Sequence, residues 1–406
     1  MKVFTYTSLC VALLVPTAPA HAQPGPTLKQ AFDTAWARQP EAGGSELRRN
    51  AVEARRDAAG NWLVAQPNIE MSTRTDVVNR NDGSREYEVG VGLPLWLPGE
   101  RSSARALADA EGDALQSRLL ATQLRLAAEV RNAWWSAVQA GVDLELAQAR
   151  LKLAEQLAGD VARRVRAGDL ARADQHQADG AAAAASALLA ETQSQAVQAR
   201  QRLRSLLGTP QELPREIAAE ALPSGSVDEN RHPALREIAD RAEAARRAKA
   251  LAATQTRNNP QLLLTTRRDR GTFSDPYAQT VGIGVRIPFG ADNRQQARIV
   301  SAEADAVEAE MRLARDRESV LAEIDAARAR LAASEAQLNA TARRATLARE
   351  TRGFFDKSFR LGESDLPTRL RVELESYEAE RQLAKSRIAA AQAISQLRQA
   401  LGLLPE

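Results

Sequence analysis

The sequence predicts a mainly α-helical protein with a small β part, built from one unit that occurs twice. The first observation is a constant offset, because 362 − 168 and 402 − 208 both give 194 for two pairs of glycines. The second is composition: aromatic residues are only 4% of the 406 residues, while Ala, Arg, Glu, Gln and Leu fill most of the chain. Together with long proline-free stretches, these features predict a duplicated β-hairpin joined to very long coiled-coil helices.

The first 22 residues have the pattern of a secretory signal peptide. Lys2 supplies the positive charge, residues 3–15 are mostly apolar, and Ala20-His21-Ala22 forms a small-residue cleavage site. Cys10, the only cysteine of the chain, lies inside this segment. We therefore expect a mature chain without disulfides, without a thiol catalyst and without a cysteine for lipid attachment.

The predicted first repeat covers residues 23–209. Its N-terminal helix runs from Thr27, which can cap the first turn, to about Gly60. Alternating polar and apolar residues then predict two strands joined by a polar hairpin loop, at about 67–78 and 85–97. Two long helices follow, at about 100–165 and 170–207. At 1.5 Å per residue the first of these is roughly 100 Å long, far beyond an ordinary globular helix.

A proline-spaced linker at 210–233 separates this unit from the predicted second repeat, residues 234–406. The second repeat has strands expected at about 262–268 and 279–289 and long helices expected at about 294–360 and 366–402. In both repeats apolar residues of the long helices recur at alternating spacings of three and four, the pattern of a coiled coil. In the first repeat they are Leu144, Ala147, Leu151, Ala154, Ala158, Val161 and Val165. Trp134 and Trp135, in the same long helix, are expected to pack between helices.

The predicted strands constrain the assembly. They are amphipathic and about as long as a tilted strand that crosses an outer membrane. Four strands cannot close a transmembrane barrel, since the smallest known have about eight, and open sheet edges are not tolerated in lipid. If these strands span a membrane, several chains must complete one barrel together.

Charge and residue chemistry exclude several classes of function. The chain has 55 basic and 52 acidic residues, and no segment concentrates Lys and Arg beside aromatic residues, so we expect no nucleic-acid partner. His176 and His232 are the only histidines after the signal peptide and lie in different elements. A tight metal site needs three or four converging ligands, so we expect no resident metal and no cofactor. No nucleophile–base pattern stands out, and the sequence predicts no catalytic site.

Several matched segments carry a resemblance to a known family. Gly168 and Gly362 break the two long helices, and each repeat closes on a glycine, in Leu206-Leu207-Gly208 and Ala400-Leu401-Gly402. The strand exits, Leu93-Pro94-Leu95 and Ile287-Pro288-Phe289, also correspond. With these features the whole mature chain resembles the TolC-type outer-membrane efflux proteins. The turn Leu97-Pro98-Gly99-Glu100-Arg101 is most similar to the branch that serves heavy-metal (cobalt-zinc-cadmium type) efflux.

The resemblance implies a homotrimer with a 12-stranded β-barrel in the outer membrane, in contact with its lipid, and an α-helical barrel through the periplasm. It also implies that a periplasmic adaptor protein and an inner-membrane pump of the resistance-nodulation-division class dock at the far end of the helical barrel. Export through such a duct is passive, and the cargo expected first is heavy-metal cations. Organic toxicants or drugs are the alternative cargo.

The same resemblance assigns candidate site residues. The adaptor-contacting tips of the helical hairpins would comprise Gly168, Asp169, Arg166, Gly362 and Arg360. Asp174 stands where the family has an acidic gate residue, although an ordinary first-turn charge explains it as well. In the second hairpin Thr368 and Arg371 replace the aspartates expected there, so Asp365 or Glu363 would have to supply the charge. Trp96 fits an aromatic girdle at a membrane interface, with an ordinary core position as the alternative.

A function of a different class is a periplasmic coiled-coil scaffold or adaptor without a channel. An adaptor would be expected to have one helical hairpin flanked by compact β-domains, whereas this chain has two hairpins and no such domains. A scaffold would also have no reason to place alternating strands at matched points of both repeats. The sequence therefore favours the duct.

Overall fold

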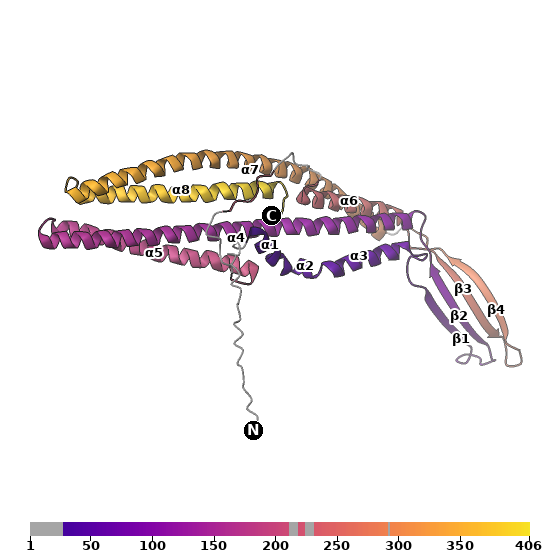
Figure 1. Ribbon diagram of the computed structural model, residues 1–406. Helices are drawn as coiled ribbons and strands as arrows, with labels where there is room; N and C mark the ends of the chain where they lie inside the picture. Colours follow the sequence, from indigo (N-terminus) through magenta and orange to yellow (C-terminus); the bar gives the residue numbers. More distant parts are fainter. Residues whose placement is uncertain (1–26, 211–217, 224–230, 291–292) are drawn as a thin grey trace, which may run out of the picture.

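The structure is a computed structural model that shows a long helical body with a small sheet at one end (Figure 1). The residues that it describes are 27–210, 218–223, 231–290 and 293–406. The predicted mainly helical class with a small antiparallel sheet is confirmed. The predicted signal peptide, 1–22, lies outside the described residues.

Two helices of nearly equal length form the body: α4 (Glu100–Ala167) and α7 (Asn293–Leu361). Each folds back on a shorter partner, α4 on α5 (Arg172–Leu207) and α7 on α8 (Leu366–Ala400). The two helical hairpins end side by side, opposite the sheet (Figure 1). Buried small residues, among them Ala147 and Ala345, let these long helices approach closely.

The N-terminal segment corrects one expectation, because it forms three helices and not one from Thr27 to Gly60. They are α1 (Leu28–Ala37), α2 (Pro40–Gly43) and α3 (Ser45–Gly60). Gln39 is extended, at φ −71° and ψ 135°. A residue before proline is pushed out of the helical region, which explains the break. The bend lets α1 pack on the middle of α4 while α3 runs along α4 towards the sheet.

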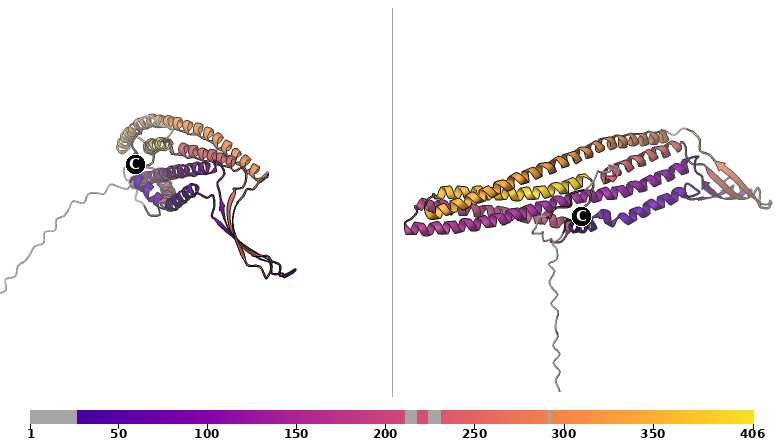
Figure 2. Two further views of the ribbon diagram at one scale, coloured as in Figure 1. Left: turned by 90° about the vertical axis from the view of Figure 1, so that its right-hand side faces the viewer. Right: turned by 45° about the horizontal axis from the view of Figure 1, so that its top comes forward.

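Helix α6 (Pro233–Thr254) was missed by the sequence prediction, which placed only a linker and then a strand in this part of the second repeat. Its proline occupies the first helical turn, where the missing N–H costs nothing. It packs against α4 and α7, so α3, α4, α6 and α7 lie side by side in the half next to the sheet (Figure 2). The linker expected at 210–233 is described only in part.

The sheet has four antiparallel strands in the order β1-β2-β3-β4. They are β1 (Asn68–Thr75), β2 (Arg85–Pro94), β3 (Gln261–Arg270) and β4 (Ala278–Arg286). The β2–β3 pairing joins the two repeats, with Val91 opposite Leu264. Within the described residues β1 and β4 each pair on one side only, so both edges of the sheet are open.

The strand ends differ from the predicted ones for local reasons. The first strand stops at Thr75, not at 78, because the Asp76 carbonyl accepts the amides of Asn79, Arg80 and Asn81 and turns the chain. The second stops at Pro94 and not at 97. In the second repeat β3 extends to residue 270, beyond the expected 268, and β4 ends at 286, before the expected 289.

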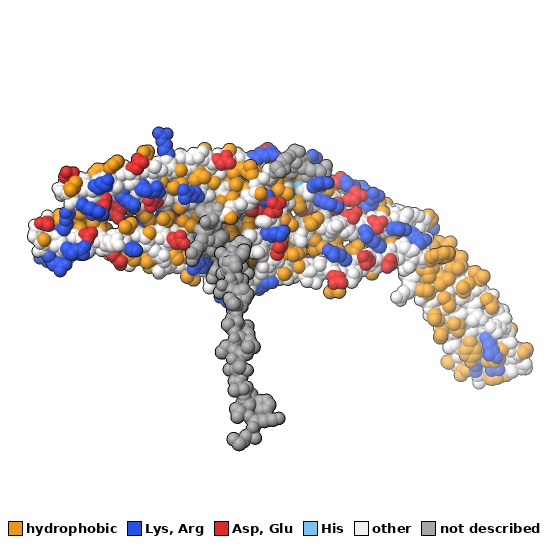
Figure 3. All heavy atoms as spheres, in the orientation of Figure 1, with side chains coloured by type: hydrophobic (Ala, Val, Ile, Leu, Met, Phe, Trp, Pro, Cys, Tyr) orange, Lys and Arg blue, Asp and Glu red, His pale blue; other side chains and the backbone are white. Residues whose placement is uncertain are grey.

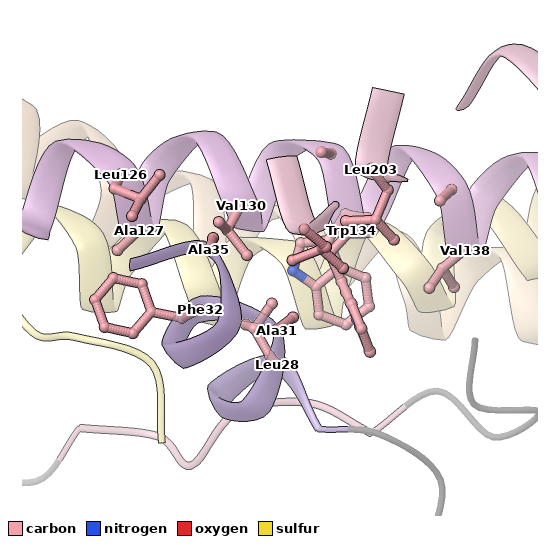
Figure 4. Packing of buried hydrophobic residues seen from close by; sticks show 14 of the residues in the cluster. Leu28, Ala31, Phe32, Ala35, Leu126, Ala127, Val130, Trp134, Val138 and Leu203 are labelled. Carbon is pink, nitrogen blue, oxygen red and sulfur yellow. The ribbon is translucent and has the colours of Figure 1, made fainter. Parts of the chain in front are cut away.

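The main hydrophobic core lies where α1 crosses α4. Leu28 and Phe32 of α1 face Val130 and Trp134 of α4 (Figure 4). The Trp135 indole N–H donates to Ser395 Oγ of α8 at 3.0 Å. Packing of Trp134 and Trp135 between helices, as predicted, is therefore confirmed.

Glu100 connects the two repeats at the junction of the sheet and the helical body. Its side chain is fully buried and accepts hydrogen bonds from the Leu97 amide at 3.0 Å and from Gln255 Nε2 at 2.9 Å. Asn259 Nδ2 donates to the same carboxyl group and also to the Leu95 carbonyl, at 3.1 Å. One first-repeat side chain thus fixes the segment that leads from α6 into β3.

We expect Glu100→Ala to destabilise the fold by about 2–4 kcal/mol, because it leaves buried amide donors without an acceptor. The measurement is the unfolding transition of the purified protein in detergent, followed by helical circular dichroism. Glu111→Ala is the matched control, since Glu111 pairs with Arg55 on the surface and should contribute at most about 1 kcal/mol. Equal effects of the two changes would contradict the role given to Glu100.

Candidate functional site

Two regions of the molecule carry the features of a site: the tips of the two helical hairpins and the exposed sheet at the opposite end (Figure 1). The tips are built by the same backbone motif in both repeats. At the first tip Gly168 takes φ +86°, its N–H donates to the Val165 carbonyl, and the Asp169 N–H donates to the Arg164 carbonyl at 2.9 Å. This pair of hydrogen bonds ends a helix around a residue in the left-handed conformation, which glycine adopts without strain.

The second tip repeats the arrangement. Gly362 takes φ +78°, its N–H donates to the Phe359 carbonyl, and the Glu363 N–H donates to the Ser358 carbonyl at 2.9 Å. The sequence therefore located both turns correctly, and the side chains beside them are exposed. Arg166 Nε donates to the carbonyl of Ala162 in its own helix, and Arg360 pairs with Asp356 at 2.8 Å.

A buried phenylalanine holds the two tips together. Phe359 of α7 lies between two guanidinium groups, Arg164 of α4 at 5.2 Å and Arg369 of α8 at 4.7 Å from the ring centroid. Arg164 also donates to the carbonyls of Phe359 and Arg360, at 3.3 Å each. Because these bonds join the first hairpin to the second, they set how far the tips can separate.

The sequence analysis did not single out these tip residues. Arg369 pairs with Asp356 at 2.6 Å, and both Arg369 and Arg164 stack on Phe359. The available signal was weak: Phe359 is one of only 7 phenylalanines in the chain and precedes a helix break. Its contact with Arg164 comes from a helix almost 200 residues earlier, which no local pattern reveals.

Two of the three candidate gate acids have local roles in the single chain. Asp174 Oδ2 accepts the Ala171 amide at 3.0 Å at the start of α5, and Asp365 caps α8 by accepting the Thr368 amide at 3.2 Å. Hydrogen bonds donated by the side chain and backbone of Thr368 hold the pKa of Asp365 below its usual range. Glu363 is exposed. In the described part of the chain none of the three forms an ion pair with Lys or Arg.

A groove of about 450 Å³ runs between the hairpins just above the tips. It is lined by apolar side chains, among them Leu153, Leu157 and Val372, and by charged ones, among them Arg352 and Glu373. Such a mixed surface can accept an amphipathic helix, whose apolar stripe would meet the apolar residues and whose polar flanks would meet the charges.

The sheet at the other end has two chemically different faces, because side chains alternate along each strand. One face is apolar and open to solvent: Met71, Val281 and Ile283 are 77–78% exposed. Figure 3 shows how hydrophobic side chains cover the sheet, in contrast with the charged helical body. The members of this apolar face are Ile69, Met71, Tyr87, Val89, Val91, Leu264, Val281, Ile283 and Val285.

The opposite face is polar, and the sheet curls towards it. Arg286 of β4 reaches Glu70 of β1 at 3.4 Å, although β2 and β3 lie between these strands. In a flat sheet the two edge strands would be roughly 14 Å apart. The polar face is therefore concave and the apolar face convex. Trp96 lies at the base of the sheet, half-buried, and its indole N–H donates to the Asn61 carbonyl at 3.0 Å.

The described residues contain no group of three or more His, Cys, Asp or Glu placed to hold a metal ion. His232 Nε2 lies 3.1 Å from the Ala400 carbonyl, a contact between α6 and the end of α8. Among the described helices, none is both long and apolar enough to cross a membrane.

The chain was compared with known proteins. The family model "Outer membrane efflux protein" matches residues 32–209. A curated relative, the cobalt-zinc-cadmium resistance protein CzcC of Cupriavidus metallidurans, is 26% identical over 298 residues, which cover 71% of this chain and 69% of CzcC.

Solved structures share the fold over almost the whole chain. The outer membrane protein VceC of Vibrio cholerae superposes with a TM-score of 0.76 at 19% identity and covers 93% of this chain and 97% of its own. The open-state outer membrane channel MtrE of Neisseria gonorrhoeae gives a TM-score of 0.71 at 19% identity, with 93% and 89% coverage. This chain therefore resembles the TolC-type outer membrane efflux proteins, because the family model matches residues 32–209 and solved outer membrane proteins share its duplicated fold.

Proposed function

We propose that this protein is the outer-membrane exit duct of a tripartite efflux system. The observation that carries the proposal is the curled sheet with an apolar convex face, a polar concave face and two open edges. In lipid an unpaired strand edge is costly, and joining β1 of one copy to β4 of the next removes both edges. Three copies give a closed barrel of twelve strands, within the range of known barrels.

The helical tips supply the other end of the duct. A periplasmic adaptor docks on the helix breaks formed by Gly168, Asp169, Arg166, Gly362 and Arg360, with the groove between the hairpins receiving part of an adaptor helix. An inner-membrane pump of the resistance-nodulation-division class delivers the cargo and the energy. The duct itself performs no catalysis, in agreement with a family whose members are channels.

The proposed location is the outer membrane of a Gram-negative bacterium, with the helices in the periplasm, after cleavage of the signal peptide at residue 22. The two repeats, 23–209 and 234–406, each contribute one β-hairpin and one helical hairpin. Trp96, at the base of the sheet, would lie at the periplasmic interface of the outer membrane. The proposed cargo is heavy-metal cations, supported by the similarity to a protein named for cobalt, zinc and cadmium resistance.

The trimer can be tested with paired cysteines, because no cysteine follows Cys10 in the chain. We expect Ser72→Cys in β1 combined with Thr280→Cys in β4 to give covalent trimers with a short bismaleimide in membranes. The two strands lie at opposite edges of the sheet, so a covalent trimer forms only if each edge meets the edge of another copy. Each single-cysteine variant is the control and should stay monomeric on a denaturing gel. Only monomers from the double variant would favour a periplasmic scaffold over a duct.

The cargo prediction is tested in a host that lacks its own metal-efflux duct. Co-expression with a cognate adaptor and pump should raise tolerance to cobalt, zinc or cadmium, and a chain without residues 262–289 should not. Raised tolerance to organic toxicants and not to metals would contradict the proposed metal cargo and would still agree with the proposed duct.

The gate prediction separates charge from helix capping. Asp174→Asn and Asp365→Asn keep a side chain that can cap a helix while removing a negative charge. If these acids ring the closed end, the double variant should show higher single-channel conductance and lower cation selectivity in planar bilayers. Asp160→Asn is the control, because Asp160 pairs with Arg163 of its own helix. Unchanged selectivity and conductance would leave both acids as helix caps only.

A further inference from the structure

The apolar face of the sheet ends in a cluster of arginine and aromatic side chains at the loop end. Strand pairing places Arg85 opposite Arg270 and Tyr87 opposite Arg268. By alternation these four side chains lie on the same face as Val89, Val91 and Leu264. Figure 3 shows Lys and Arg side chains near the free end of the otherwise hydrophobic sheet. We call Arg85, Arg268, Arg270, Tyr87, Phe273 and Tyr277 the rim cluster.

Aromatic rings organise the rim cluster. Tyr277 lies under Arg268 at 4.7 Å and under Arg270 at 4.9 Å, measured from guanidinium carbon to ring centroid. Phe273 lies under Arg270 at 5.4 Å. Stacking on a ring orients a guanidinium plane and leaves its N–H groups free to meet a planar or tetrahedral anion.

Charge is uneven between the faces of β3. Arg267, on the concave face, pairs with Asp269 at 3.4 Å and with Glu86 at 3.7 Å. Arg268 and Arg270, on the convex face, have no carboxylate within ion-pair distance among the described residues, and Arg270 donates only to the Gly83 carbonyl. The convex rim therefore presents two uncompensated positive charges beside an apolar surface.

The two loops also hold one another in place. The Phe273 amide donates to the Asp82 carbonyl at 3.1 Å, so the loop of the second hairpin is bonded to the loop of the first. Arg85 forms an ion pair with Asp76 at 2.8 Å, and the Asp76 carboxylate also accepts a hydrogen bond from the Gly83 amide at 3.1 Å. Arg85 thus fixes the loops, while Arg268 and Arg270 remain for a ligand.

We propose that the rim cluster is a binding site for the phosphate group of a membrane lipid headgroup. This inference rests on the proposed membrane location of the sheet. A phosphate between Arg268 and Arg270 would form charge-assisted hydrogen bonds, and the attached acyl chains would continue along the convex face over Val281 and Ile283. A free phosphate ion would contact the two arginines but would leave the apolar convex face uncovered, whereas a lipid would contact both.

The test uses the purified, detergent-solubilised protein and diphosphoryl lipid A as the probe, with binding measured by native mass spectrometry. We expect Arg268→Gln combined with Arg270→Gln to weaken lipid A binding by about tenfold or more, since two charge-assisted contacts are lost. Arg267→Gln is the matched control, on the same strand but on the concave face, and should bind lipid A as the wild type does.

Three outcomes would overturn the proposal. Equal binding of lipid A by the double variant and the wild type would remove the arginines from the site. Equal binding of dephosphorylated lipid A by the wild type would show recognition of acyl chains alone. Full competition by millimolar inorganic phosphate would make the ligand a free anion. Single-channel conductance tests the proposed duct separately, and the double variant should conduct as the wild type does. A wild-type protein that forms no channel in a bilayer would count against the duct and not against the lipid site.

Discussion

The hydrogen-bonding requirement of two open strand edges is the constraint on which this structure depends. β1 and β4 present unpaired N–H and C=O groups beside an apolar convex face. In lipid these backbone groups have no hydrogen-bond partner, and in water the apolar face stays exposed and the open edges can pair with another chain. The curl of the sheet towards its polar face, marked by the Arg286–Glu70 contact, prepares the edges for closure with further copies. This geometry supports the proposal that the sheet is one part of a closed ring.

The rest of the molecule transmits that geometry over a long distance. Helices α4 and α7 begin beside the sheet and end at the two tips, so any relative slip would misplace both ends. Buried polar contacts oppose such slip: Glu100 ties the repeats where the helices start, and Arg164 ties them where the helices end. Between these points small residues such as Ala147 and Ala345 allow close packing over many turns, which a helix of larger side chains would prevent.

The two ends of the molecule differ in how much of their chemistry a single chain completes. At the tips Arg164 and Arg369 stack on Phe359, and two of the candidate gate acids, Asp174 and Asp365, cap helices, so most local groups are satisfied. At the sheet, by contrast, the two strand edges lack hydrogen-bond partners, the convex apolar face is uncovered, and Arg268 and Arg270 have no carboxylate partner among the described residues. In the proposed duct, lipid and neighbouring copies would supply these missing partners, whereas an adaptor at the tips would have to compete with existing contacts or use the groove beside them.

The sequence by itself determined the duplicated plan, the strand–strand–long-helix order and both helix breaks. The reason is that glycine, proline and a period of two or 3.6 residues act locally. Local chemistry also explains a signal that was overlooked, Pro40, which splits the N-terminal helix. Only the tertiary structure decided the curl of the sheet, the stacking of Arg164 and Arg369 on Phe359, the burial of Glu100 and the pairing of the rim loops. Each of these features includes a contact between residues of different repeats, and no pattern within one repeat encodes where its partner across the chain will lie.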